Sequence, residues 1–228
     1  MGFFDVPPPP EPPPPPETEP EGPEWFGPPG NVLGAPISDI VVLHRSERLA
    51  VAVVGLTAFP TGTMFSLLTK ARAGLDLDEL DMDPPWMRRQ YGRRGSADDA
   101  FRFGVAFADG RKATTLGDPF HRGGATPEAD SDIVLIERGG EGGSHTWNQG
   151  YWLWPLPPPG QLQFVCEWPA RGLPETRATM DAGQLISAAA HAITLWDREP
   201  GRGDDGVHMS RADLRVSRGN PPSDAEQA

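Results

Sequence analysis

Residues 101–110 read Phe101-Arg102-Phe103-Gly104-Val105-Ala106-Phe107-Ala108-Asp109-Gly110, and large apolar side chains occupy alternate positions. Successive side chains of a β-strand point to opposite faces, so this period of two predicts a strand with one apolar face. Asp-Gly tolerates the positive φ angles of a type I′ turn, and the chain then resumes as Arg111 to Leu116. We therefore predict a β-hairpin in this region.

The same pattern recurs on both sides of this hairpin. Leu49–Ala58 and Gly62–Ala71 predict a second hairpin, because Pro60 presets the φ angle that a turn between them needs. Further strand candidates are Asp39–Leu43, Ile133–Ile136, Tyr151–Trp154, Leu162–Trp168 and Thr176–Met180. About eight or nine strands separated by Gly, Pro and Asp turns predict a mainly β domain, either a β-sandwich or a partly open barrel.

One segment has helical spacing instead. Asp181 and Gln184 stand three residues apart, as in a capping box at a helix N-terminus. An apolar stripe at helical spacing follows, formed by Leu185, Ala189, Ile193 and Trp196. We predict a single C-terminal amphipathic helix over residues 182–196, packed on a sheet.

The two ends of the chain differ in composition from the middle. Residues 1–30 contain thirteen prolines and six acids but no Lys or Arg, and residues 198–228 are rich in Gly, Arg and Asp. Such segments cannot recover the conformational entropy lost on ordering, so both are expected to be disordered tails. Residues 31–197 then form one β-rich domain. The proline-rich segment 7–16 favours polyproline II, as a spacer or as a docking ligand for a protein partner.

Charge and cysteine content bear on compartment and partners. The formal net charge is −12, which argues against a general affinity for nucleic acid or anionic membranes. Cys166 is the single cysteine, so an intramolecular disulfide cannot form. The first residues lack a secretory pattern, and no apolar run reaches the roughly 20 residues of a membrane span. These features favour a cytoplasmic protein.

Three segments of the core resemble a known family. They are Leu49-Ala50-Val51-Ala52-Val53 leading to Phe59-Pro60-Thr61-Gly62, Phe103-Gly104-Val105 with Phe107-Ala108-Asp109-Gly110, and Trp154-Pro155-Leu156-Pro157-Pro158-Pro159-Gly160 running on to Cys166-Glu167-Trp168-Pro169. Through these segments, most of residues 38–197 resembles a family of uncharacterised cytoplasmic proteins from high-GC actinobacteria. The resemblance implies one compact cytoplasmic domain and no particular activity.

Motifs with known chemistry are incomplete. Residues 201–206 match G-x-G-x-x-G, but no predicted strand precedes them and no predicted helix follows, so a dinucleotide site is not expected. Residues 139–143 lack the Gly-Lys-Ser/Thr ending of a P-loop, and we interpret them as a hairpin loop. The five histidines show no metal-ligand spacing, and Cys166 alternates with buried-type aromatics. We therefore predict no catalytic, cofactor or metal residues, and we lean against an enzyme.

Two candidate binding regions remain. Trp152 and Trp154 share one face of a strand, and with Tyr151 and Trp168 they form either core or an aromatic platform for a ligand. The long connection 74–99 is the second region, because connections of this length inside compact domains tend to be functional or disordered. Its candidate interaction residues are Arg88, Arg89, Tyr91, Arg93 and Arg94.

Three functions follow from these features. The leading hypothesis is a non-catalytic interaction or scaffold module, which uses the proline-rich tail or the 74–99 connection. The alternative is a sandwich that binds a small ligand or glycan through its tryptophans. The third is an enzyme whose site assembles only in three dimensions. The oligomeric state does not follow from the sequence.

Overall fold

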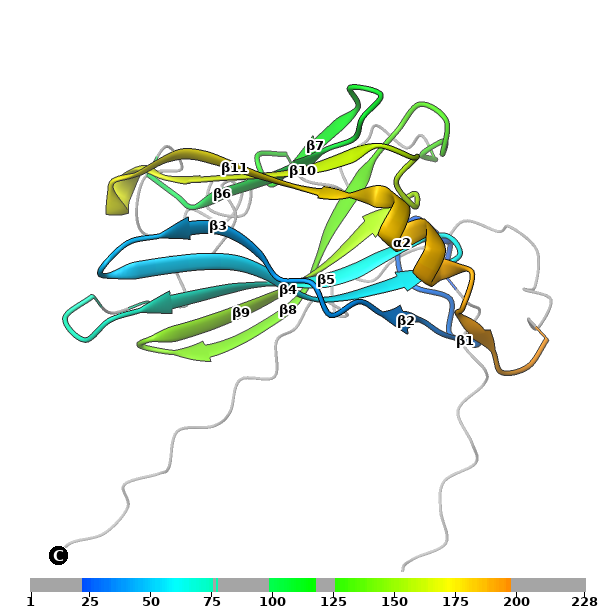
Figure 1. Cartoon of the computed structure of the whole chain (residues 1–228), viewed down its shortest axis with the longest axis horizontal. Coiled ribbons are helices and arrows are strands. Elements are labelled where there is room, and N and C mark those ends of the chain that lie inside the picture. Colours follow the sequence, from blue (N-terminus) through cyan, green and yellow to red (C-terminus); the bar gives the residue numbers. More distant parts are fainter. Residues whose placement is uncertain (1–21, 76, 78–98, 118–125, 198–228) are drawn as a thin grey trace, which may run out of the picture.

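The computed structural model describes residues 22–75, 77, 99–117 and 126–197. These residues form mainly β-structure with one α-helix (Figure 1). The strands are β1 (Val32–Leu33), β2 (Ala35–Pro36), β3 (Val41–Arg45), β4 (Leu49–Phe59), β5 (Gly62–Ala71), β6 (Arg102–Ala106), β7 (Lys112–Thr114), β8 (Val134–Gly143), β9 (Thr146–Trp154), β10 (Gln161–Trp168), β11 (Leu173–Asp181) and β12 (Ile193–Thr194). The α-helix is α2 (Ala182–Ala189), and a short 3₁₀-helix, η2, spans Pro169–Arg171. Strands β3 to β11 overlap the strands predicted from the sequence, whereas β1, β2 and β12 were not expected.

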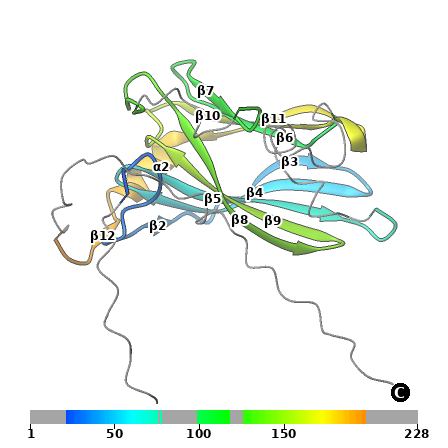
Figure 2. The ribbon, with the colours of Figure 1, turned by 180° about the vertical axis from the view of Figure 1, so that it is seen from behind.

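The strands form two main sheets and one small one. The larger sheet has the order β2-β4-β5-β9-β8, with β3 also pairing to β4, and the smaller sheet has the order β11-β10-β6-β7. Figures 1 and 2 show these sheets as separate layers that face each other, an arrangement consistent with the predicted β-sandwich. Strands β1 and β12 pair with each other as a two-stranded sheet.

The inner core lies between the two main sheets and follows from the alternation of side chains along each strand. In β10, alternate side chains from Leu162 to Trp168 are buried, while Gln163, Val165 and Glu167 between them are half-buried. Four aromatic rings from both sheets contact one another with centroids 5.0–6.4 Å apart, namely Phe65, Phe103, Tyr151 and Phe164. Such contacts bury large apolar area, which is the main favourable term in folding.

Both predicted hairpins are present. Strand β4 pairs with β5 up to Phe59 opposite Gly62, so Pro60 lies in the turn as predicted. Strand β6 pairs with β7, but their connection differs from a two-residue type I′ turn. The amide of Gly110 donates to the carbonyl of Phe107 at 3.1 Å, and Gly110 has φ 90°. This is a turn from Phe107 to Gly110 in which glycine supplies the left-handed position.

The glycine-rich segment 139–143 is not the hairpin loop that the sequence indicated. It belongs to β8 and pairs with β9, from Gly140 opposite Gln149 to Gly143 opposite Thr146. The pairing register shifts between Glu137 and Gly140, and Gly139 has φ 60° at this bulge. Glycine is suited to a bulge because it adopts positive φ without a side-chain clash.

A second core, the outer core, lies on the opposite face of the larger sheet. Its buried residues are Phe59, Val134, Ile136, Trp152 and Trp154. Residues 22–31, here called the strap, cover this cluster with the half-buried side chains of Trp25 and Phe26. The Nε1 of Trp152 donates to the carbonyl of Glu24 at 3.2 Å. Packed structure therefore begins before residue 31, where we expected the domain to start.

The C-terminal helix is shorter than predicted. Asp181 caps it by accepting a hydrogen bond from the amide of Gly183 at 2.8 Å, and Leu185 is fully buried. The helix ends at Ala189, and Ile193 and Thr194 pair with β1 instead of continuing it to residue 196. Pairing with a distant segment outweighs the local helical period here. Among the described residues, no helix has the length and apolar character that a bilayer crossing needs.

Candidate interaction surface at the β1–β12 ribbon

The four aromatic residues proposed as a ligand platform are all buried. Trp152 and Trp154 belong to the outer core, whereas Tyr151 and Trp168 belong to the inner core. None of the four is more than 7% exposed. Their side chains fill the two cores, so they leave no aromatic platform for a glycan or another ligand to stack on.

Among these four residues, Tyr151 has a titratable side chain, and its pKa is strongly shifted. Its hydroxyl donates to Oε1 of Glu137 at 3.4 Å across the β8–β9 pair. Burial in the core raises the pKa of Tyr151 well above its usual range, and the charge of Glu137 raises this pKa further. A phenol held neutral in this way is a structural group with no route to a substrate.

The candidate interaction residues Arg88, Arg89, Tyr91, Arg93 and Arg94 lie outside the described residues. Both ends of their connection are nevertheless fixed. The amide of Leu77 donates to the carbonyl of Ser144 at 2.7 Å, and the amide of Ala170 donates to the carbonyl of Asp99 at 3.4 Å. The connection therefore leaves and re-enters the domain beside the β8–β9 turn and η2.

Within the described residues, we find no group of side chains arranged for catalysis or metal binding. No cluster of three or more His, Cys, Asp or Glu residues is placed to hold a metal ion. Cys166 is buried beside Thr176, with Sγ 3.3 Å from Oγ1. Burial raises the pKa of Cys166, although the hydrogen bond with Thr176 lowers it in part. A buried thiol with a raised pKa is a poor nucleophile.

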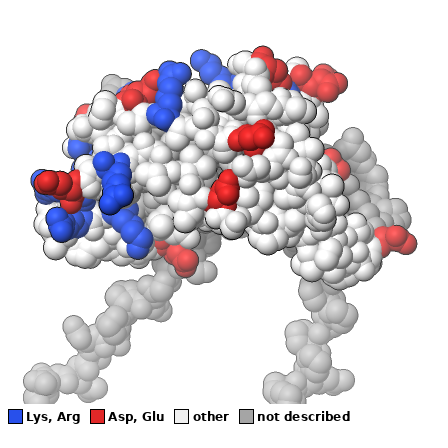
Figure 3. Space-filling model, in the orientation of Figure 1, with Lys and Arg blue, Asp and Glu red and all other residues white. Residues whose placement is uncertain are grey.

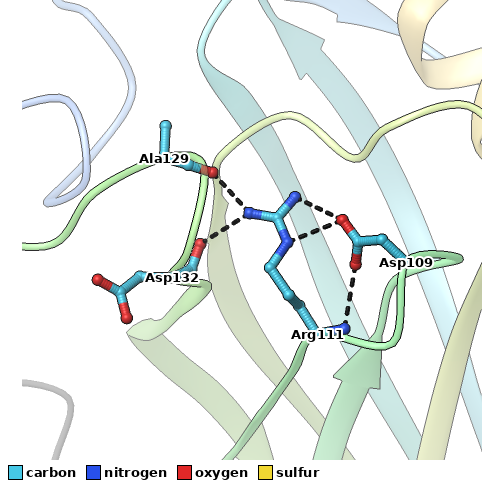
Figure 4. Close-up of polar contacts among 4 residues, drawn as sticks. All are labelled: Asp109, Arg111, Ala129 and Asp132. Atoms are coloured by element: carbon cyan, nitrogen blue, oxygen red, sulfur yellow. Dashed lines mark hydrogen bonds and ion pairs between the residues drawn. The ribbon is translucent and has the colours of Figure 1, made fainter.

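Arg111 makes several hydrogen bonds and an ion pair that stabilise the hairpin turn (Figure 4). Its guanidinium pairs with Asp109 at 2.8 Å and also donates to the carbonyls of Ala129 and Asp132. The hydrogen bonds from Arg111 lower the pKa of Asp109. Because its donors serve the turn and the 129–132 segment, Arg111 has a structural role and does not form a reactive site.

A group of exposed apolar side chains lies instead on β1, β12 and the two residues that follow β12, here together called the ribbon. Leu33 and Ile193 are directly opposite each other across the ribbon and are 54% and 60% exposed. Leu195 and Trp196 follow at once, and they are 42% and 59% exposed. Four of the seven large apolar side chains that are exposed in the described part of the chain thus gather on this one small element.

The ribbon is held in place and is not a frayed terminus. The amide of Leu195 donates to the carbonyl of Asn31 at 2.8 Å, and Nδ2 of Asn31 donates to the carbonyl of Trp196 at 2.8 Å. The neighbouring residue Val32 packs on the outer core. The apolar side chains are therefore presented on fixed backbone, which lowers the entropy cost of binding a partner.

Figures 1 and 2 place the ribbon at the end of the molecule that also carries α2. Few charged side chains lie over this end, whereas Lys and Arg gather at the opposite end, where the β3–β4 turn lies (Figure 3). A small apolar surface with few charges around it is typical of a protein interaction site.

Comparisons with known proteins identify no relative. No family model, curated protein or solved structure matches the chain.

The sequence reasoning missed the ribbon because it assigned Ile193 and Trp196 to the buried stripe of a helix. A local signal against that helix was present, since Ile193 and Thr194 are both β-branched and favour strands. Their partners, Val32 and Leu33, are too distant in sequence for the pairing to be inferred from spacing.

Proposed function

We propose that this chain is a non-catalytic binding module of the β-sandwich type, and that it docks a protein partner through the apolar surface of the ribbon. The observation that carries the proposal is the exposed cluster of Leu33, Ile193, Leu195 and Trp196 on fixed backbone. Isolated exposed apolar residues are normal on soluble proteins, but several of them gathered on one small element cost solubility and are typical of interfaces.

Two further features support a binding role over an enzymatic one. Two of the described groups with shifted pKa values, Tyr151 and Cys166, are buried in packed structure, and the lowered pKa of Asp109 comes from its hydrogen bonds with Arg111. Arg111 is committed to backbone carbonyls and to Asp109 in the same turn. The cytoplasmic location and the resemblance to actinobacterial proteins stay predictions, and the proposal depends on neither.

The test is affinity capture from the source cells with the full chain and two matched variants. Ile193→Ser removes an apolar side chain of the ribbon surface, whereas Ile40→Ser removes an apolar side chain outside the ribbon that is 65% exposed. Loss of the same captured protein with Ile193→Ser, and its retention with Ile40→Ser, supports the ribbon as the docking surface. Equal capture by all three chains overturns that assignment.

A second measurement separates a partner from self-association. The molecular mass of the purified chain is measured by light scattering over a range of concentrations. A dimer that dissociates in Ile193→Ser, with no captured protein, would make the ribbon an interface between copies of this chain. It would contradict the proposed role as a module for another protein.

A further inference from the structure

The end of the molecule opposite the ribbon carries a compact group of bases, here called the basic end. It comprises Arg45 at the end of β3, Arg48 in the β3–β4 turn, Lys70 near the end of β5 and Arg72 directly after β5. All four are exposed. The chain has an overall net charge of −12, so this group has the opposite sign to the molecule as a whole.

The register of the larger sheet sets the spacing of two of these bases. Arg45 pairs with Ala50, and Ala50 pairs with Lys70, so the three form one row across β3, β4 and β5. Residues opposite each other in a sheet share a face, and strands lie about 4.8 Å apart. Arg45 and Lys70 are therefore on one face, roughly 10 Å apart, with only the small side chain of Ala50 between them.

The turn that carries Arg48 is tied to the chain that follows β5. The Nη2 of Arg48 donates to the carbonyl of Gly74 at 3.0 Å, and the amide of Arg72 donates to the carbonyl of Arg48 at 2.9 Å. These bonds hold Arg48 and Arg72 beside each other. The positive charges of the basic end are thus arranged on fixed backbone.

Carboxylates do not neutralise this group within the described residues. None of the four bases forms an ion pair there, and Glu47 in the same turn is the adjacent acid. Because four positive charges lie close together here, an anionic segment is attracted to this end. Figure 3 shows Lys and Arg gathered at this end of the molecule.

The chain itself contains an acidic segment that can reach this surface. Residues 1–21 carry five acids and no Lys or Arg, and they join the described structure at the strap. The strap lies on the outer face of the same sheet, the face to which Ala50 and Lys70 point. In polyproline II a residue spans about 3.1 Å, so 21 residues reach roughly 65 Å, more than the width of a domain of this size.

We propose that the acidic N-terminal segment, residues 1–21, docks within the same molecule on the basic end formed by Arg45, Arg48, Lys70 and Arg72. Tethering gives the segment a high effective concentration at this surface. An acidic partner from outside must displace the segment before it can bind there. The contact is electrostatic and exposed, so it is weakened by salt.

The experiment places a nitroxide on the full chain at Val6→Cys and records the broadening of backbone amide signals by nuclear magnetic resonance. Selective labelling is feasible because the natural cysteine, Cys166, is 1% exposed. At low ionic strength, broadening is expected at residues 45–50 and 70–72. In about 1 M salt, where the Debye length is about 3 Å, the broadening is expected to disappear.

Two double variants provide the matched comparison. Arg45→Glu with Lys70→Glu reverses charge at the basic end, and Lys112→Glu with Arg177→Glu makes the same charge change on the smaller sheet. Broadening at residues 45–50 should be lost in the first pair and kept in the second. Broadening that is spread over the whole surface, or that is unchanged by the first pair, overturns the proposal.

A mixed sample decides whether the contact is within one molecule. Spin-labelled chains without ¹⁵N are mixed with ¹⁵N chains that carry no label. Absence of broadening in this mixture supports the intramolecular contact. Broadening of the same amides in the mixture overturns it, because the occupant would then be the N-terminal segment of a second copy.

Discussion

The sequence offered Trp152 as a candidate ligand-binding residue, whereas the structure shows its side chain packed in the outer core. Its ring contacts Phe59 with centroids 5.8 Å apart, and its Nε1 is bonded to the strap. Truncation of a fully buried tryptophan removes packing and leaves a cavity, which costs about 3–5 kcal/mol. We predict that Trp152→Ala lowers the free energy of unfolding by this amount in urea titrations.

The control for this prediction is Trp196→Ala, which removes a tryptophan that is mostly exposed. Its effect on the free energy of unfolding should stay within about 0.5 kcal/mol. Similar costs for the two variants would show that the outer core is not packed as described here.

At Tyr151, burial and the charge of Glu137 hold the pKa above the ordinary value of about 10. A raised pKa means that the folded state holds this proton more tightly than the unfolded state does. The resulting stabilisation is complete below about pH 10 and is lost as the pH rises through the folded-state pKa. We predict that, as the pH rises from about 9 to 12, the free energy of unfolding falls less in Tyr151→Phe than in the parent chain.

The measurement is the urea midpoint of both chains across this range. A Tyr91→Phe background leaves Tyr151 as the single tyrosine, so that its ionisation can be followed by ultraviolet absorbance. Ionisation of Tyr151 at an ordinary phenol pKa in the folded chain would contradict the predicted effect of burial.

At the scale of elements, the N-terminus of α2 depends on one hydrogen bond from Gly183 to Asp181. Loss of an N-cap side chain typically costs about 1 kcal/mol, whereas Asn caps a helix about as well as Asp. We predict that Asp181→Ala lowers the free energy of unfolding by about 1 kcal/mol and that Asp181→Asn leaves it nearly unchanged. Equal losses in both variants would show that charge, not capping, is the role of Asp181.

The same helix shows which elements can be predicted from the sequence. Its start follows from Asp181, and the bounds of β4 and β5 follow from side-chain alternation, because both signals lie within the segment itself. The end of α2 does not follow from the sequence, because Ile193 and Thr194 pair with β1 instead of continuing the helix. The candidate surface was missed for the same reason: it forms where two segments far apart in the chain meet.

At the scale of the whole molecule, the larger sheet is covered by the smaller sheet on its inner face and by the strap over the outer core. The composition of residues 1–30 is dominated by proline and acid, which favours a tail and conceals the two aromatic residues that pack. Arg138 adds to the cover, because its guanidinium lies 4.5 Å from the ring centre of Phe26. Composition averaged over thirty residues cannot detect a contact made by two of them.

The strap therefore gives the last prediction, which compares chains that begin at Gly22 and at Asn31. The first keeps Trp25 and Phe26, so its unfolding temperature should match that of the full chain. The second loses two half-buried aromatic side chains, worth roughly 2–3 kcal/mol together, which corresponds to a fall of about 5–10 °C. It also uncovers Trp152 and Trp154, so a dye that binds apolar surface should fluoresce more strongly with this chain than with the first. Identical unfolding temperatures and dye signals for the two chains would show that the outer core is stable without its cover, and the domain would then begin at residue 31.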